Sequence, residues 1–270
     1  AGQEANEFIH SEGKDCFTTR KFWQPLADSL DSPNAVTVLD GEPHKIVRRA
    51  LKQPLARKTV EQNIQDIVAI IRHNFDAIAG SQQVPFVFAS QKLSSNIVGH
   101  LLMDTIPTDE QLRHFFRYSN TLTVVLSVLR LPAMALRLQG PGFYRSRKVA
   151  QALMTSVVNK AVSQAHTRKL LVDTLLEAQQ QYPELFTTGD INSSGFLAFF
   201  AGIDTMGQTL SFMLWELLKN PSLLAQLQDE VDHVYITQDY VPTAQDLQER
   251  LPLCRAVFME ALRLHPTAFG

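Results

Sequence analysis

The 270-residue sequence has little cysteine: Cys16 and Cys254 lie far apart, and neither has metal-ligand spacing around it. Two such residues do not make a disulfide framework, so we expect a reducing compartment, the cytoplasm. An excess of one charge is also missing, because 25 Lys and Arg face 27 Asp and Glu, for a formal net charge of −2. This balance gives no reason to expect nucleic-acid binding through bulk charge.

Leader-like and long hydrophobic segments are missing too. Residues 1–8 are polar and acidic, which is not the pattern of a signal peptide. The longest apolar candidate, residues 122–136, is interrupted by Arg130 and Pro132, so we do not expect it to span a membrane. Membrane association is therefore not evident, and an anchor upstream of residue 1 stays an open alternative.

Alternating strand patterns are nearly absent, and the apolar residues instead recur with helical periodicity. The pattern predicts helices at residues 60–79, 91–103, 109–130, 144–165, 168–181, 191–219, 221–234 and 251–264. We expect residues 84–88 to form a short apolar segment before a helix. Residues 131–142 are rich in Leu, Pro and Gly, which predicts a loop or short turns. The sequence therefore predicts a mainly α fold.

The most apolar predicted helix contains the segment Phe-Ala-Gly-Ile-Asp-Thr at residues 200–205. Residues 195–203 are apolar on all sides, so we expect this helix to run through the interior. The small pair Ala201 and Gly202 lets a flat molecule approach the backbone, and the hydroxyl of Thr205 can bond back into the helix and open it locally. The equally weighted alternative is a packing groove, with Thr205 bonded to a carbonyl and Asp204 facing solvent.

Glu260 and Arg263 lie three residues apart on a predicted helix that ends near Pro266. Such a pair is commonplace on an exposed face, and among the apolar neighbours here it could instead be buried. In either case its chemistry favours a structural role over catalysis.

His44 and Arg48 lie one turn apart, after an Asp-Gly turn and a proline suited to a first helical turn. Two such groups on one face suit a pair of carboxylates or phosphates. A solvated basic helix is the more common meaning of this pattern.

Taken together, the three sites resemble the cytochrome P-450 family. D-G-x-x-H-x-x-x-R-R at residues 40–49, A-G-x-D-T at 201–205 and E-x-L-R-L-H-P at 260–266 match its C, I and K helices. The resemblance covers essentially the whole chain and places residues 131–142 at the F–G loop. It implies a mainly α cytochrome P-450 fold, with residues 1–270 forming one partial domain from helix B to helix K.

The resemblance also implies a cofactor, haem b. His44 and Arg48 would hydrogen-bond the propionates, and Ala201 and Gly202 would lie against the porphyrin on the oxygen-binding side.

Catalytic and structural roles follow from the same resemblance. Thr205 would donate a hydrogen bond to bound dioxygen or peroxide, and Asp204 would help to deliver protons. Glu260 and Arg263 would belong to a structural network and not to the reaction.

Substrate contacts are implied at Leu197 and Phe200, shortly before Ala201 in the sequence. Phe22, Trp23 and Leu26 would lie in the substrate loop between helices B and C. The aromatic residues near Phe200 suggest a bulky apolar ligand such as a terpenoid, steroid or fatty acid. Core packing would use the same residues.

The sequence departs from the family pattern in two respects. Met206 replaces the Thr or Ser that often follows Thr205, a mild change. The resemblance also ends near Gly270, without the N-terminal sheet and without the later loop that carries the axial cysteine. Neither Cys16 nor Cys254 stands in that context, so no metal ligand is assigned here, and we expect the 270-residue segment alone to be inactive.

The leading hypothesis is therefore a haem monooxygenase that uses O2 and two electrons from a redox protein, a ferredoxin or a flavoprotein reductase. A basic strip could help to dock that donor: Lys45, Arg48, Arg49, Lys52, Arg57 and Lys58. The alternatives are a helical scaffold or binding protein without haem and, ranked last, a peroxide-driven oxygenase. Retention of Asp204 and Thr205 argues against both.

Overall fold

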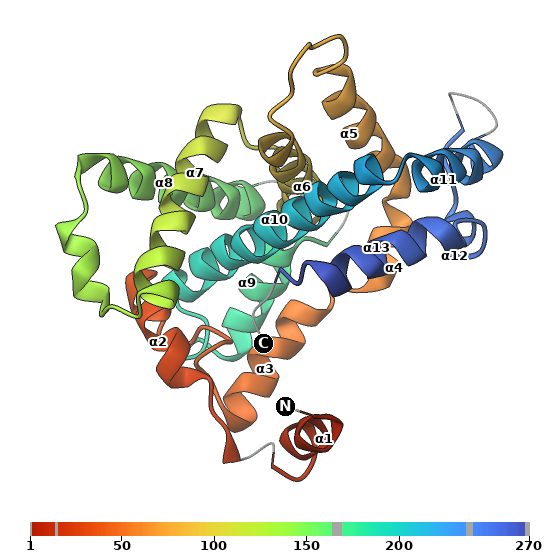
Figure 1. Cartoon of the computed structure of the whole chain (residues 1–270). Helices are drawn as coiled ribbons and strands as arrows, with labels where there is room; N and C mark the ends of the chain where they lie inside the picture. The colour runs from red at the N-terminus through yellow and green to blue at the C-terminus, as the bar shows by residue number, and fades with distance from the viewer. Residues whose placement is uncertain (1, 14–15, 164–168, 236–239, 268–270) are drawn as a thin grey trace. The chain divides into compact units, whose positions relative to one another are not determined.

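The computed structural model describes all residues except 1, 14–15, 164–168, 236–239 and 268–270, and the described residues contain helices and turns but no strand. The chain divides into two compact units, whose helices are labelled in Figure 1. Unit 1 comprises Ala1–Gln53 and Arg113–Phe196, and unit 2 comprises Pro54–Leu112 and Leu197–Gly270. The mainly α prediction is confirmed, and the assignment of residues 1–270 to one partial domain stays a prediction.

Unit 1 is built from helices on both sides of the segment that belongs to unit 2. Its elements are α1 (Gln3–His10), α2 (Arg20–Ser29), α3 (Gly41–Lys52), most of α7 (Asp109–Leu122), the π-helical turn η2 (Thr123–Val128), the 3-10 turn η3 (Ala133–Leu138), α8 (Pro141–Ser163), α9 (Leu171–Gln181) and the start of α10 (Thr188–Lys219). Phe115, Tyr118 and Phe196 form an aromatic cluster at its centre, with ring centroids 4.8 Å apart for Phe115 and Phe196 and 5.4 Å apart for Tyr118 and Phe196. Burial raises the pKa of Tyr118 to about 12, because the phenolate would lose its hydration there.

A buried carboxylate organises the polar contacts of unit 1. Asp190 is only 3% exposed, and its Oδ1 accepts hydrogen bonds from Ser32 Oγ (2.8 Å) and the Asn34 amide (2.9 Å). Its Oδ2 accepts from Thr187 Oγ1 (2.6 Å), the Thr187 amide (3.1 Å) and Asn34 Nδ2 (3.1 Å). These bonds tie the segment after α2 to the start of α10 and offset the cost of burying the charge.

Unit 2 contains α4 (Arg57–Gln62), α5 (Ile64–Asp76), α6 (Phe86–Met103), the remainder of α10, α11 (Pro221–Val234), α12 (Ala244–Glu249) and α13 (Pro252–Leu264). Helix α5 packs against α6, and α11 packs against α13. Glu230 of α11 accepts hydrogen bonds from the amides of Leu253 (2.7 Å) and Cys254 (2.8 Å). The carboxylate therefore caps the start of α13, where amides would otherwise lack partners.

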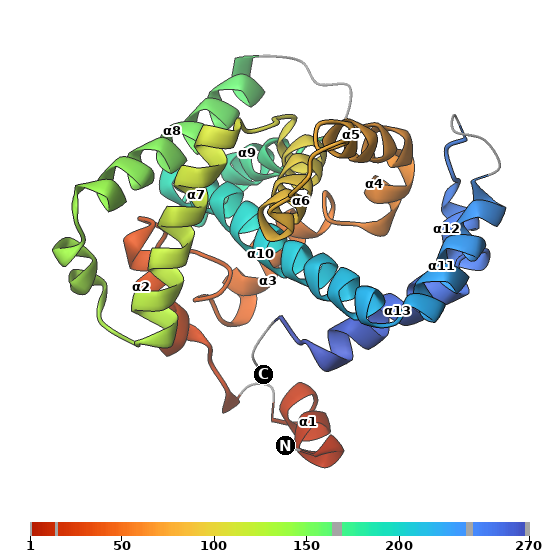
Figure 2. The ribbon, with the colours of Figure 1, turned by 45° about the horizontal axis from the view of Figure 1, so that its top comes forward.

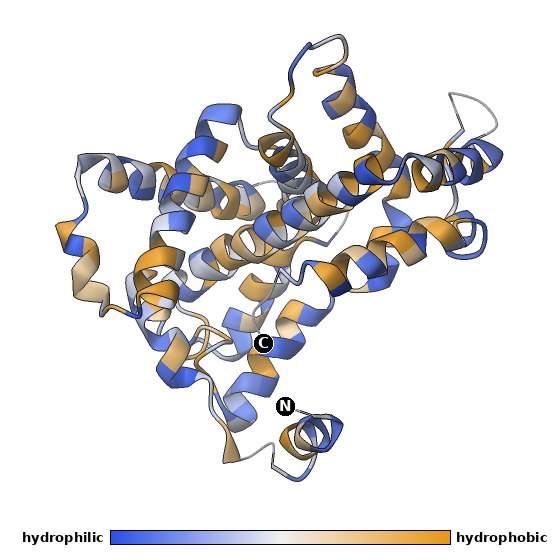
Figure 3. Ribbon diagram, viewed as in Figure 1, coloured by the Kyte–Doolittle hydropathy of each residue, from blue (hydrophilic) through white to orange (hydrophobic). Residues whose placement is uncertain are grey.

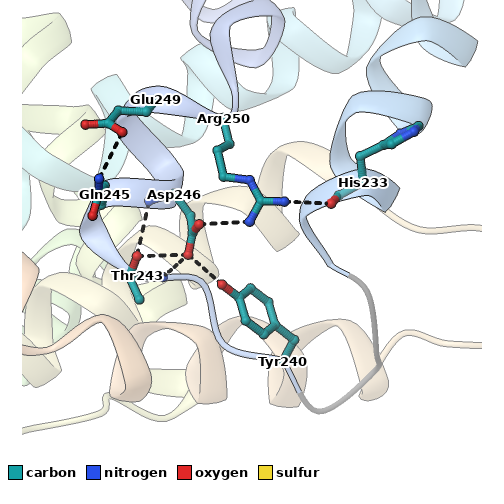
Figure 4. Close-up of polar contacts among 7 residues, drawn as sticks. All are labelled: His233, Tyr240, Thr243, Gln245, Asp246, Glu249 and Arg250. Carbon is teal, nitrogen blue, oxygen red and sulfur yellow. Dashed lines mark hydrogen bonds and ion pairs between the residues drawn. The ribbon is translucent and has the colours of Figure 1, made fainter.

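The turn before α12 depends on Asp246 (Figure 4). Its carboxylate accepts hydrogen bonds from Tyr240 Oη (2.6 Å) and from Thr243 Oγ1 (2.8 Å) and the Thr243 amide (2.9 Å). Arg250 donates to the same carboxylate (3.0 Å) and to the carbonyl oxygen of His233 (3.0 Å). These donors, Tyr240 first, hold the pKa of Asp246 well below its usual range, so the group stays ionised at neutral pH.

Several helix boundaries differ from the sequence expectation. The predicted helix at residues 60–79 is broken into α4 and α5 at Asn63, and α6 begins at Phe86, within the piece read as preceding it. The helix expected to reach Arg130 ends at Leu122, because the chain changes to the π-helical turn and Arg130 then adopts a positive φ of 51°. Residues 141–142 belong to α8 and not to the preceding loop, and the predicted ends at residues 165 and 168 lie outside the described residues.

By length and composition alone, α10 could cross a membrane. The apolar runs in the sequence had predicted no membrane-spanning segment. Apolar and polar residues are interleaved along it (Figure 3), and Phe199 and Ile203 are buried while Ala201 is exposed. The expectation that this helix runs through the interior therefore holds for only part of its surface, because Ala201 is exposed. Within unit 2, α10 packs against α6, as a core helix does.

Replacing Asp190 by Asn should destabilise the protein by about 2–4 kcal/mol, because an amide Nδ2 cannot accept the bonds that Oδ2 now accepts. Urea unfolding measures the loss. Asp28→Asn is the matched control, since Asp28 is exposed and its carboxylate bonds Gln24 on the same helix and no other side chain in the described part of the protein. It should change stability by less than about 0.5 kcal/mol. Equal effects of the two substitutions would contradict the role given to Asp190.

Candidate functional site

The candidate site lies on the part of α10 that belongs to unit 2. Thr205 Oγ1 donates a hydrogen bond to the carbonyl oxygen of Ala201, one turn earlier, at 2.5 Å. This is the packing alternative considered for Thr205, and such back-bonding occupies the hydroxyl proton while leaving the oxygen free to accept. Ala201 is exposed and Gly202 has no side chain, so this stretch of α10 presents no bulky group beside the hydroxyl.

Helix α6 approaches α10 closely at two glycines of α10, and the two helices lie side by side in both views (Figures 1 and 2). A Cβ on Gly207 would lie 2.9 Å from the Cα and 3.0 Å from the amide nitrogen of Gln91. A Cβ on Gly202 would lie 3.0 Å from a methyl group of Val98. The absence of side chains at these positions is what permits the close approach.

Across this contact, Gln91 Nε2 donates a hydrogen bond to Asp204 Oδ1 at 2.9 Å. Burial raises the pKa of the Asp204 carboxyl, and the bond from Gln91 partly offsets this by stabilising the charged form. Asp204 is half-buried, so the alternative in which it faces solvent does not describe it. No motif or periodic pattern marked Gln91, which lies 113 residues away from Asp204 in the sequence, on an apolar helix.

His44 and Arg48 lie on α3 of unit 1, one turn apart as predicted. The helix begins at Gly41, whose φ of +64° makes the predicted Asp-Gly turn. Neither side chain makes a hydrogen bond or ion pair with the residues that the structure describes, so both can bind an anion. His44 also lines a cavity of about 910 Å³ within unit 1.

The residues expected at the substrate divide into exposed and buried ones. Phe22 and Trp23 pack edge to face, with ring centroids 4.9 Å apart, and Phe22 is 47% exposed, whereas Leu26 is buried. All three lie on α2, so the expectation of a loop at this point is wrong: the segment forms a helix despite Pro25. Leu197 and Phe200 of α10 are both half-buried.

The aromatic residues beside Phe200 are core residues. Phe196 is 3% exposed and stacks within the aromatic cluster of unit 1, and Phe199 is fully buried in unit 2, against the helix position of Gly99. Their burial is the packing alternative considered from the sequence, so these two residues do not indicate a substrate class.

Glu260 and Arg263 form a two-bonded ion pair on α13, with both N–O distances 2.7 Å. The two side chains are exposed (54% and 67%), so the alternative of a buried pair does not apply. The bond from Arg263 lowers the pKa of Glu260. At this exposure the pair contributes little to stability by itself.

His265 of the same motif connects the end of α13 to α10. Its ring stacks on Phe212 (centroids 4.3 Å apart, planes at 5°), and its Nε2 lies 3.0 Å from Glu216 Oε1. The bond from His265 is the main cause that lowers the pKa of Glu216. Sequence reasoning assigned this histidine no role, although its place in the motif marked it.

Neither cysteine lies in a metal-binding cluster. Among the described residues, no group of three or more His, Cys, Asp and Glu side chains could hold a metal ion. Cys16 is exposed, and burial raises the pKa of the half-buried Cys254 thiol near the start of α13.

Gly207→Ala should destabilise the protein by about 1–3 kcal/mol, because the new Cβ meets backbone atoms of Gln91 that cannot move independently. Gly202→Ala should change stability by less than about 1 kcal/mol, since the Val98 side chain can shift and alanine favours the helix. Thermal unfolding of both variants checks the difference, and a Gly207→Ala protein as stable as the Gly202→Ala protein would contradict it.

Comparisons with known proteins agree with these features. The family model for cytochrome P-450 matches residues 3–269. A cytochrome P-450 monooxygenase of Aspergillus fumigatus is 29% identical over 169 residues, which are 57% of this chain and 50% of that protein. Geraniol 8-hydroxylase of Catharanthus roseus is 33% identical over 117 residues, which are 42% of this chain and 23% of that enzyme.

Among solved structures, a retinoic-acid-bound cyanobacterial cytochrome P-450 superposes with a TM-score of 0.79 at 18% identity, covering 98% of this chain and 58% of that one. The chain thus spans half or less of the length of these two curated relatives. The family model nevertheless matches almost every residue, including the three motifs. This chain belongs to the cytochrome P-450 family.

Proposed function

We propose that the protein is a haem-dependent monooxygenase that inserts one oxygen atom of O2 into an apolar small molecule, with two electrons supplied by a redox protein. The observation that carries this proposal is the pair Asp204 and Thr205 on α10, one turn after Ala201 and Gly202, with the carboxyl held by Gln91. A non-catalytic scaffold has no need of an acid and a hydroxyl in this setting.

The residues assigned to haem b fit that group chemically. His44 and Arg48 have no partner among the described residues and would bind the two propionates, for which the Arg fork is suited. Exposed Ala201 and half-buried Gly202 offer α10 backbone without bulky side chains, against which a flat ring would lie. When bound, haem supplies the activation of dioxygen and the oxidising power.

The side chains of α10 would manage protons. Thr205 would turn its hydroxyl away from the Ala201 carbonyl oxygen and donate a hydrogen bond to dioxygen or peroxide. It would regain the bond to Ala201 afterwards. Asp204 would take a proton from water at its carboxylate and pass it on. Its raised pKa supports this role, because a carboxyl that ionises nearer to neutral pH exchanges protons more readily in both directions.

Apolar side chains would bind the substrate. Leu197 and Phe200 precede the catalytic pair on α10. On α2, Phe22 and Trp23 leave apolar surface partly exposed, and Leu26 of the same helix is buried. Desolvation of such surface favours an apolar ligand.

The proposal is tested on the protein at its full encoded length by a reduced carbon-monoxide difference spectrum. A Soret band at the thiolate-ligated position supports the proposal, and the absence of any haem signal would favour the scaffold. Thr205→Ala should then raise the hydrogen peroxide released per dioxygen consumed by about tenfold, because the hydroxyl no longer supplies its proton. Thr209→Ala is the matched control: its hydroxyl bonds the Thr205 carbonyl one turn further along α10, and it should leave the ratio unchanged.

We further propose that the electron donor is an acidic protein that binds the basic residues of α3. Four cations of this helix are exposed: Lys45, Arg48, Arg49 and Lys52. Lys45 forms an ion pair of 3.1 Å with Glu42 on the same helix. Arg57 and Lys58 of the predicted strip are exposed too, but they belong to α4 of unit 2. A cluster of exposed cations attracts an acidic partner and accelerates the encounter.

Lys45→Glu with Arg49→Glu should slow reduction by the donor about tenfold or more at low salt, without changing substrate affinity. Stopped-flow reduction and substrate titration measure the two quantities. Arg137→Glu with Lys148→Glu changes the net charge equally but lies on η3 and α8, and it should have a smaller effect. Unchanged reduction in the α3 variant would remove this docking proposal.

A further inference from the structure

A neutral side chain, Gln91, is the direct partner of the half-buried carboxyl of Asp204. Burial and the Gln91 bond are the two causes that shift the pKa of Asp204, and no charged side chain of the described part of the chain adds to them. The charge of Asp204 is therefore stabilised by one amide, without a counter-ion that would fix it permanently.

Backbone packing fixes the place of Gln91. Its Cα and amide nitrogen lie where a Cβ on Gly207 would reach within 3.0 Å, so the α6 backbone rests on α10 at this residue. The preceding residue, Ser90, shares a hydrogen bond of 2.8 Å with Ser211 of α10. The amide of Gln91 is thus presented to Asp204 from a backbone that packs directly on α10.

The bond also makes the two carboxyl oxygens different. Oδ1 accepts from Gln91, whereas Oδ2 accepts no hydrogen bond from the residues that the structure describes. A proton bound at Asp204 would go to Oδ2, because a proton on Oδ1 would compete with the amide. Gln91 therefore selects the oxygen that exchanges protons.

We propose that Gln91 is a positioning residue for Asp204: it orients the carboxyl, favours its ionised form and leaves Oδ2 as the proton-exchanging oxygen. The catalytic meaning of this inference rests on the proposed function, in which Asp204 delivers protons. The contact itself does not depend on bound haem, so it can be tested separately.

Gln91→Met keeps the length of an unbranched side chain and removes the donor. In infrared titration of the full-length protein, with the Asp204→Asn spectrum subtracted to isolate the carboxyl band, Gln91→Met should raise the pKa of Asp204 above that of the unmodified protein. Ser90→Ala is the matched control, because it removes a neutral hydrogen bond between the same two helices without touching Asp204. It should leave this pKa unchanged.

The second measurement is dioxygen consumption with the electron donor present. Gln91→Met should slow it about three- to tenfold, as expected when a proton-transfer group is misplaced, and Ser90→Ala should not. Urea unfolding of both variants confirms that each is folded. An unchanged Asp204 pKa in Gln91→Met, or equal effects of the two variants on both measurements, would overturn the proposal. If Asp204→Asn itself consumes dioxygen at the normal rate, the proposed role of Asp204 fails, while the infrared titration still decides whether Gln91 controls its ionisation.

Discussion

The close approach of α6 to α10 is the constraint on which the candidate site depends. It requires glycine at 207, because a side chain there would strike the backbone of Gln91, whereas a side chain at 202 would meet only the side chain of Val98. Because the helices are this close, the side chain of Gln91 reaches the carboxyl of Asp204. Helix packing and the environment of the carboxyl are thus coupled: a change that separates the helices would also release the carboxyl from the amide that stabilises its charge.

The two units solve the problem of buried polar groups in related ways. In unit 1, Asp190 accepts hydrogen bonds from two segments that are far apart in sequence. In unit 2, Asp246 accepts hydrogen bonds from residues close to it in sequence, around one turn. Both carboxylates have donors at each oxygen. Asp204 has a donor at one oxygen among the described residues, a difference that agrees with the proton-transfer role proposed for it.

The motif at residues 260–266 shows that ion pairs alone say little about stability. Glu260 and Arg263 are well aligned but exposed, so water screens their attraction. His265 makes the tertiary contacts of this motif instead, by stacking on Phe212 and bonding Glu216 of α10. The motif therefore connects α13 to α10 mainly through its histidine.

The sequence by itself determined the mainly α fold, the position of α10 and the adjacency of Asp204 and Thr205, because helical periodicity and motif spacing are local properties. Tertiary structure decided which residues are buried: Phe196 and Phe199 became core, Ala201 stayed exposed, and the α2 segment became a helix. Tertiary structure also decided the contact between Gln91 and Asp204. A contact between residues 113 positions apart depends on how two helices pack, and no periodic pattern in the sequence indicates it.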